Sequence, residues 1–195
     1  MHNEGVSQIA RSGTGVSASP WLRNASTVVA GSLLLAVCAH ISVPLWFTPV
    51  PLSLQPFGVL LLGLLLAPHL AAGTLVAYLA EGIAGLPVFA PGIVSGPAHL
   101  LGPTGGYLMA YPAAAFLVSL LWRRSGRGFF AAFASAAAGD LLILGCGAAW
   151  LAIVTPARPA SMLLGSMLMF LPGDLLKSAA AAGIAWGGLR FKRAR

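Results

Sequence analysis

The chain alternates between long apolar runs and shorter segments rich in proline, glycine or arginine. The first apolar run covers about residues 25–43 and is flanked by Trp21 on one side and by Trp46 and Phe47 on the other. About 20 apolar residues cross the hydrocarbon layer of a bilayer, and tryptophans gather at its interfaces. The pattern therefore predicts a first membrane-spanning helix.

A second apolar region follows the double-proline segment 47–55 and is divided by Pro68 and His69. Its halves, about 52–67 and 70–84, hold too many residues for one crossing and slightly too few for two. We expect two short helices joined by a tight turn, and a single long kinked helix is the alternative. Short segments interrupted by proline are typical of binding sites in membrane transporters.

Further apolar runs complete the pattern, and spans are expected at about 106–122, 129–154 and 174–189. Residues 85–105 carry repeated glycine and proline, and a connection of this length usually has a function, such as a loop over a binding site. A short helix over 161–170 is expected to end at the Pro172-Gly173 pair, because proline interrupts the hydrogen bonds of a helix.

Residues 1–20 are polar and rich in serine and glycine, which predicts a disordered tail before a single six-helix domain over 21–195. Six spans place both termini on one side of the membrane. The basic residues of that side are Arg11, Arg23, Arg123, Arg124, Arg127, Arg190, Lys192, Arg193 and Arg195, against Arg158 on the other. Because positive loops favour the cytoplasm, both termini are predicted to be cytoplasmic, with segments 47–55 and 85–105 outside.

Composition agrees with an all-α integral membrane protein. Hydrophobic residues make up 58% of the 195 positions and charged residues 8%, with a mean hydropathy of +0.88. Soluble domains carry about a quarter of charged residues, so a soluble protein is excluded. The net charge of +7 comes mainly from residues beside apolar runs, where they set orientation, and no nucleic-acid-binding motif occurs among them. Cys38 and Cys146 lie within apolar runs and are expected to be buried, without disulfide or metal roles.

Two of the few charges inside apolar sequence are Asp174 and Lys177. A spacing of three places them on one face of a helix, and charges within a bilayer usually face a bundle interior. Such a pair offers donors and acceptors to a polar ligand. The alternative is structural, with Asp174 stabilising a helix N-terminus and Lys177 extending to the membrane interface.

Enzyme motifs are absent from the sequence. It contains no ATP-binding loop, no HExxH zinc motif and no GxSxG nucleophile motif. The Gly-Asp pairs at 139–140 and 173–174 lack the leading glycine of the GxGD motif of intramembrane proteases. The roles of Asp140 and Glu81 stay open. Small residues recur at a spacing of four in the first span, which allows another helix to approach closely: Ser26, Ala30, Ser32 and Ala36.

Four ordered motifs resemble those of the BioY family, the biotin-specific substrate-binding (S) components of energy-coupling-factor (ECF) transporters. Residues 47–55, FTPVPLSLQ, resemble its FTPVPxTxQ signature, and 78–89, YLAEGIAGLPVF, resemble YLxxGxxGLPVF. Residues 102–107 are GPTGGY, and 172–177, PGDLLK, resemble PGDxxK. With Gly147 and Trp150, the resemblance covers about residues 27–190.

The resemblance implies a six-helix S-component fold in the bacterial cytoplasmic membrane that captures biotin with high affinity at its outer face. It implies partners as well: a membrane coupling protein and two cytoplasmic ATPases, which use the ATP, so that this chain needs no cofactor or metal. The family docks through small residues of the first helix, which makes Ser26, Ala30, Ser32 and Ala36 candidate interface residues. Lipid surrounds the protein, and a homo-oligomer stays open.

The resemblance also assigns site residues. Asp174 would accept hydrogen bonds from the ureido N–H groups of biotin, and Lys177 would donate to its carboxylate or ureido oxygen, with the orientation of the ligand left open. The remaining candidates add hydrogen bonds or aromatic packing: Gln55, Tyr107, Tyr78, Phe89 and Trp46.

Three departures from the family pattern concern Ser53, where threonine is common, the charged Asp140, and the glycine-poor stretch 90–101. Two other functions stay open at this point. One is an S component for another vitamin, which the motifs disfavour. The other is a proton-coupled secondary carrier that uses Asp140 as its relay.

Overall fold

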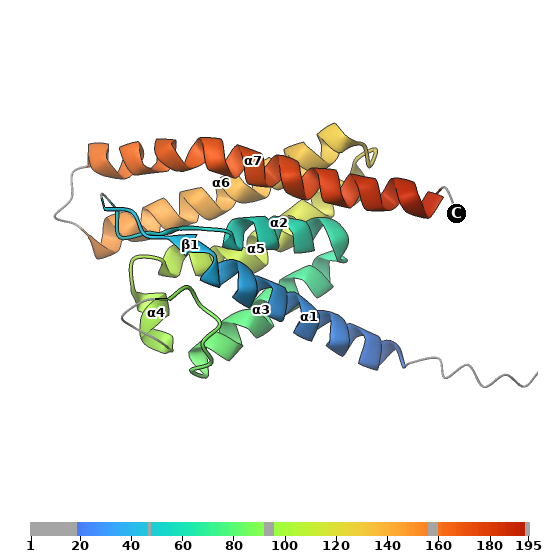
Figure 1. Cartoon of the computed structure of the whole chain (residues 1–195), viewed down its shortest axis with the longest axis horizontal. Helices are drawn as coiled ribbons and strands as arrows, with labels where there is room; N and C mark the ends of the chain where they lie inside the picture. The colour runs from blue at the N-terminus through green and yellow to red at the C-terminus, as the bar shows by residue number, and fades with distance from the viewer. Residues whose placement is uncertain (1–18, 47, 92–95, 156–159, 194–195) are drawn as a thin grey trace, which may run out of the picture.

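The computed structural model describes residues 19–46, 48–91, 96–155 and 160–193, with side chains left out at 160–167 and 192–193. Within these ranges the chain forms helices joined by short connections, and one two-stranded ribbon (Figure 1). The helices are α1 (Pro20–His40), α2 (Gln55–Leu65), α3 (Pro68–Ile83), α4 (Pro97–Leu101), α5 (Gly105–Arg124), α6 (Phe129–Val154) and α7 (Ala160–Arg193).

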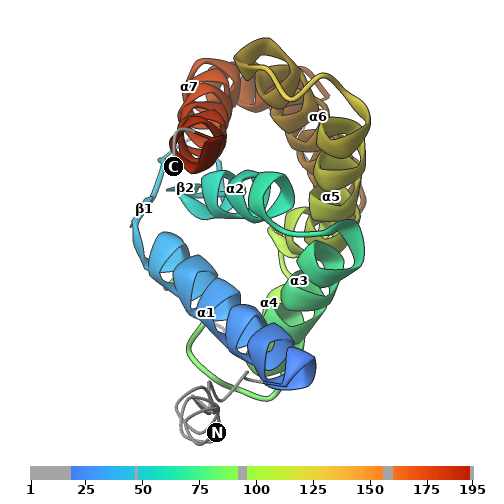
Figure 2. The same cartoon turned by 90° about the vertical axis from the view of Figure 1, so that its right-hand side faces the viewer.

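Helix α2 lies at the centre of the fold. It contacts α1, α3, α5, α6 and α7, which surround it in Figure 2. Residues 58–64 are all buried, because these helices cover every side of α2. The separate helices α2 and α3 meet at residues 66–67, so the single kinked helix considered from the sequence does not form.

The two ends of the bundle differ. The start of α1 and the end of α7 lie at one end, whereas α4 and the ribbon lie at the other (Figure 1). Near the end that holds the termini, Trp122 and the alanines of α6 and α7 form an apolar cluster. Small residues such as Ala132, Ala136 and Ala182 let α6 and α7 approach closely. Arg123 and Arg127 lie beside the end of α7, where they line a common pocket with Leu189.

Helix α7 corrects the prediction of a break at Pro172-Gly173. The helix is continuous from Ala160 to Arg193 and contains Pro172 in its interior. Proline removes one helical N–H, but membrane helices tolerate it where neighbouring groups satisfy the freed carbonyl. Asp174 is therefore inside a long helix, and the capping role considered for it is wrong.

The ribbon was not expected from the sequence. Strands β1 (Ser42–Val43) and β2 (Leu52–Ser53) pair antiparallel, with Ser42 opposite Ser53. The N–H of Leu54 also donates to the carbonyl of Ile41 at 3.0 Å. These bonds tie the end of α1 to the start of α2 and close the double-proline segment into a loop.

Among the residues that the structure describes, four helical segments are long and apolar enough to cross a membrane, and α2 is a shorter apolar helix. The four are Pro20–His40, Gly105–Arg124, Phe129–Val154 and Leu168–Phe191. The first begins about five residues before the expected start. Cys38 is buried, but Cys146 is exposed, so its expected burial is wrong. The predicted disordered tail, Phe47 and Arg158 lie outside the described residues, except for Ser19 and Pro20 at the end of that tail.

Candidate functional site

Residues at the end of the bundle that holds the ribbon line a cavity. Its wall is contributed by β2, α2, α4, α5, α6 and α7. Apolar side chains make up much of the wall, among them Leu52, Leu108, Ile143, Leu144 and Phe170. The polar lining residues are Ser53, Gln55, His99, Thr104, Tyr107, Tyr111, Asp140, Asp174 and Lys177.

Asp174 and Lys177 form an ion pair in this cavity. The Lys177 ammonium donates to Asp174 Oδ1 at 2.9 Å across one turn of α7. Only 12% of the Lys177 side chain and 5% of the Asp174 side chain are exposed. Lys177 therefore does not extend to the interface, as the structural alternative proposed. The pair places a donor and an acceptor side by side in an apolar enclosure, where charge-assisted hydrogen bonds to a ligand are strong.

Gln55 lies at the first turn of α2, and its orientation is fixed by two neighbours. Its Nε2 donates to the Tyr78 hydroxyl at 2.8 Å, and Ser53 Oγ donates to its Oε1 at 3.3 Å. The Tyr78 hydroxyl in turn donates to the Val88 carbonyl at 2.8 Å. This chain of hydrogen bonds holds the amide at the cavity wall in one orientation.

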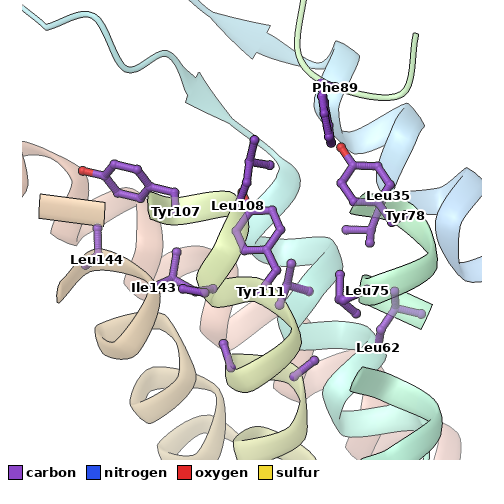
Figure 3. Close-up of a cluster of buried hydrophobic side chains, with 14 of the residues drawn as sticks. Leu35, Leu62, Leu75, Tyr78, Phe89, Tyr107, Leu108, Tyr111, Ile143 and Leu144 are labelled. Atoms are coloured by element: carbon purple, nitrogen blue, oxygen red, sulfur yellow. The ribbon is translucent and has the colours of Figure 1, made fainter. Parts of the chain in front are cut away.

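Three aromatic residues proposed for ligand packing are not in the cavity lining. Tyr78 is fully buried and packs edge-to-face on Phe89, with ring centroids 5.5 Å apart (Figure 3). The Phe89 ring also stacks on the His99 ring, with centroids 5.1 Å apart. Phe89 therefore supports a residue of the cavity wall but is not itself part of the described wall. Trp46 is 95% exposed. In this structure Tyr78 and Phe89 pack against each other and not against the cavity, and direct ligand contact by these three residues stays a prediction.

Tyr107 does line the cavity, together with Tyr111, which the sequence analysis missed. Both belong to α5 at a spacing of four, which puts them on one face and was a usable signal. The turn before α5 is held by Trp150, whose Nε1–H donates to the Gly102 carbonyl at 2.9 Å. Figure 3 shows Tyr107 and Tyr111 projecting from α5 near Ile143 and Leu144 of α6.

The lack of a side chain at Gly147 of α6 leaves room for the Tyr107 ring. A Cβ at this position would overlap the Tyr107 ring, whereas one at Gly145 would meet nothing within 4 Å. We expect Gly147→Ala to lower the free energy of unfolding by about 1–3 kcal/mol, the usual cost of overpacking. Gly145→Ala, on the same helix, is the matched control and should be neutral or slightly stabilising. Thermal unfolding in detergent measures both, and equal midpoints for the two variants would contradict the contact.

The structure also places the two acidic residues whose roles the sequence left open. Asp140 of α6 is buried and lines the cavity, whereas Glu81 of α3 is half-buried and lies outside the lining. Within the part of the chain that the structure describes, no three His, Cys, Asp or Glu side chains converge as metal ligands.

The small residues of α1 divide between two environments. Ser26 and Ala30 are exposed, next to the exposed Val29. Ala36 is half-buried, and Ser32 is only 2% exposed, with its hydroxyl donating to the Val29 carbonyl. Ser32 therefore packs inside this chain, and its assignment to an open docking surface is corrected.

A multi-helix membrane fold whose cavity combines apolar walls with a buried ion pair defines a solute-binding transport protein rather than an enzyme. The chain belongs to the BioY family, whose family model matches residues 8–194. Among its relatives, "Probable biotin transporter BioY" of Pyrococcus horikoshii is 41% identical over 152 residues, which cover 78% of this chain and 87% of the relative.

Two further relatives carry the name "Biotin transporter BioY". The Thermotoga maritima protein is 36% identical, covering 82% of this chain and 90% of its own length. The Lactococcus lactis protein is 33% identical, covering 70% of this chain and 74% of its own length. The fold is similar to the crystal structure of "the S-component for biotin from an ECF-type ABC transporter", with a TM-score of 0.80 and 27% identity over 87% of this chain and 92% of that one.

Proposed function

We propose that this chain captures biotin at the outer face of the membrane as the substrate-binding component of an ECF-type transporter. The observation that carries the proposal is the Asp174–Lys177 ion pair, 2.9 Å apart, in a largely apolar cavity. The family match and the names of the relatives, which are biotin transporters, support biotin as the ligand. The apolar wall suits the sulfur-containing ring and aliphatic chain of biotin, and the ion pair suits its ureido group.

The charges of the cavity favour one orientation of the ligand. Its lining holds two carboxyl groups, those of Asp140 and Asp174, and one ammonium, that of Lys177, which leaves an excess of one carboxyl group. This excess disfavours the carboxylate tail of biotin and favours the neutral ureido ring, whose N–H groups need acceptors. The tail then points toward an adjoining groove that shares Pro51 and His99 with the cavity and has no acidic residue in its described lining.

We further propose six crossings with both termini in the cytoplasm. The start of α1 and the end of α7 lie at the same end of the bundle, as an even number of crossings requires (Figure 1). Arg23, Arg123, Arg124 and Arg190 belong to the helix ends located there. Positive charges favour the cytoplasmic side, so the cavity at the opposite end opens outward.

The partners in this proposal are a membrane coupling protein and two cytoplasmic ATPases, which hydrolyse the ATP. The exposed face of α1 is the proposed docking surface: Ser26 and Ala30 there allow close approach of a helix, beside the exposed apolar side chains of Val29, Leu33 and Val37. Ser32 is left out of this surface because it is buried. Location in the bacterial cytoplasmic membrane follows from the same proposal.

Calorimetry on the purified protein in detergent, without ATP or partners, tests the proposal directly. We expect tight one-to-one binding of biotin and no heat of binding with thiamine or riboflavin. Binding of one of those vitamins in place of biotin would reassign the substrate. A folded sample that binds none of the three would overturn the assignment of capture to this chain alone.

A further inference from the structure

Asp140 is a buried carboxylate that has one oxygen without a partner. The residue is 5% exposed and lines the cavity from α6. Its Oδ1 is fully buried and accepts no hydrogen bond from the described residues. Buried polar atoms in folded proteins are nearly always hydrogen-bonded, and each exception calls for an explanation. A ligand that brings a donor into the cavity would supply the missing partner.

The groups that line the cavity together with Asp140 indicate which kind of ligand would bring this donor. Asp140, Asp174 and Lys177 line the same cavity. The ammonium of Lys177 is hydrogen-bonded to Asp174 and not to Asp140. The described lining of the cavity thus presents two carboxyl groups, one from α6 and one from α7, and a single ammonium.

This set of groups is the complement of a cyclic urea. Such a ring exposes two N–H donors, one on each side of a carbonyl acceptor. Two carboxylates can accept from the two N–H groups, while an ammonium donates to the carbonyl oxygen. With Asp174 and Lys177 alone, one ring N–H would be buried without a strong acceptor.

We infer that Asp140 is a further ligand-binding residue that accepts a hydrogen bond from the second ring N–H. The inference rests on the proposed function and extends it to a rule of specificity. The site selects cyclic ureas with both nitrogens unsubstituted, because a missing N–H would leave the Asp140 carboxylate buried and unpaired. A site that hydrogen-bonds a polar group rejects analogues lacking that group strongly for this reason.

The test uses calorimetry with biotin and with two analogues, each methylated on a different ring nitrogen. The variant is Asp140→Leu, which removes the acceptor at similar size and also removes a buried polar atom that has no partner, so it should fold at least as stably as the wild type. Glu81→Gln is the matched control, because it removes one negative charge from a side chain outside the cavity lining.

We expect the wild type to lose affinity for both methylated analogues. Asp140→Leu should bind biotin at least about tenfold more weakly, in line with the loss of a hydrogen bond to a charged group. In this variant, methylation of one ring nitrogen should no longer weaken binding, whereas methylation of the other should weaken it as in the wild type. Glu81→Gln should show the same affinities as the wild type.

Two results would overturn the inference. The first is biotin affinity of Asp140→Leu within twofold of the wild type, and the second is an unchanged penalty for both analogues. Either one, with tight binding by the wild type, would reject the role of Asp140 and leave biotin capture intact. Absence of biotin binding by the wild type itself would instead reject the proposed function, and this inference with it.

Discussion

Lys177→Ala is expected to weaken biotin binding at least about 100-fold. Removing one member of a buried ion pair typically costs about 3–5 kcal/mol, because the remaining charge is left uncompensated. Lys177 is bonded to Asp174 at 2.9 Å, and the carboxyl group of Asp140 lines the same cavity. Calorimetric titration of the variant with biotin measures the effect.

Arg190→Ala is the matched control for this variant. It removes the same charge from the same helix, but Arg190 lies over the ring of Trp186, at the other end of the bundle from the cavity. Its biotin affinity should equal that of the wild type. If Lys177→Ala retained wild-type affinity, the cavity would not be the biotin site.

The double variant Asp174→Leu with Lys177→Met is expected to lose biotin binding and yet be at least as stable as the wild type. Replacing both members of a buried ion pair by apolar residues of similar size is often neutral or stabilising, since no charge remains to be desolvated. Lys177→Ala alone should be the less stable variant, because it keeps the buried Asp174 carboxylate.

Thermal unfolding in detergent, together with biotin titration, separates these two effects. A double variant that unfolds at the temperature of Lys177→Ala or below would show that the pair stabilises the fold itself. Stability at or above the wild-type level with no binding would show that the pair is maintained for the ligand.

The sequence predicted the long helices well where an apolar run alone decides the structure, as in residues 129–154. The predicted break at Pro172 was wrong, because proline disfavours an isolated helix but is tolerated inside α7, where other helices pack against it. The sequence also did not indicate that α2 is central, since an apolar run has the same composition whether lipid or protein surrounds it. The ribbon was missed because strands of two residues have no detectable periodicity.

The site could be predicted in part. The spacing of Asp174 and Lys177 indicated a pair on one face, and the structure places both in the cavity. The motif that contains Tyr78 and Phe89 suggested ligand contact, but a motif does not distinguish a residue that lines a cavity from one that supports it. Asp140 could not be assigned, because its distance from the pair depends on how α6 packs on α7.

The length of α2 has a consequence for how the protein enters the membrane. Its 11 residues extend about 16 Å, roughly half the thickness of the hydrocarbon layer. A lone helix of this length would leave its polar ends in lipid, where unsatisfied backbone groups are costly. Residues 55–65 can therefore settle in the bilayer only when the neighbouring helices are present to enclose them. Insertion and tertiary packing of this segment are one event and not two successive stages.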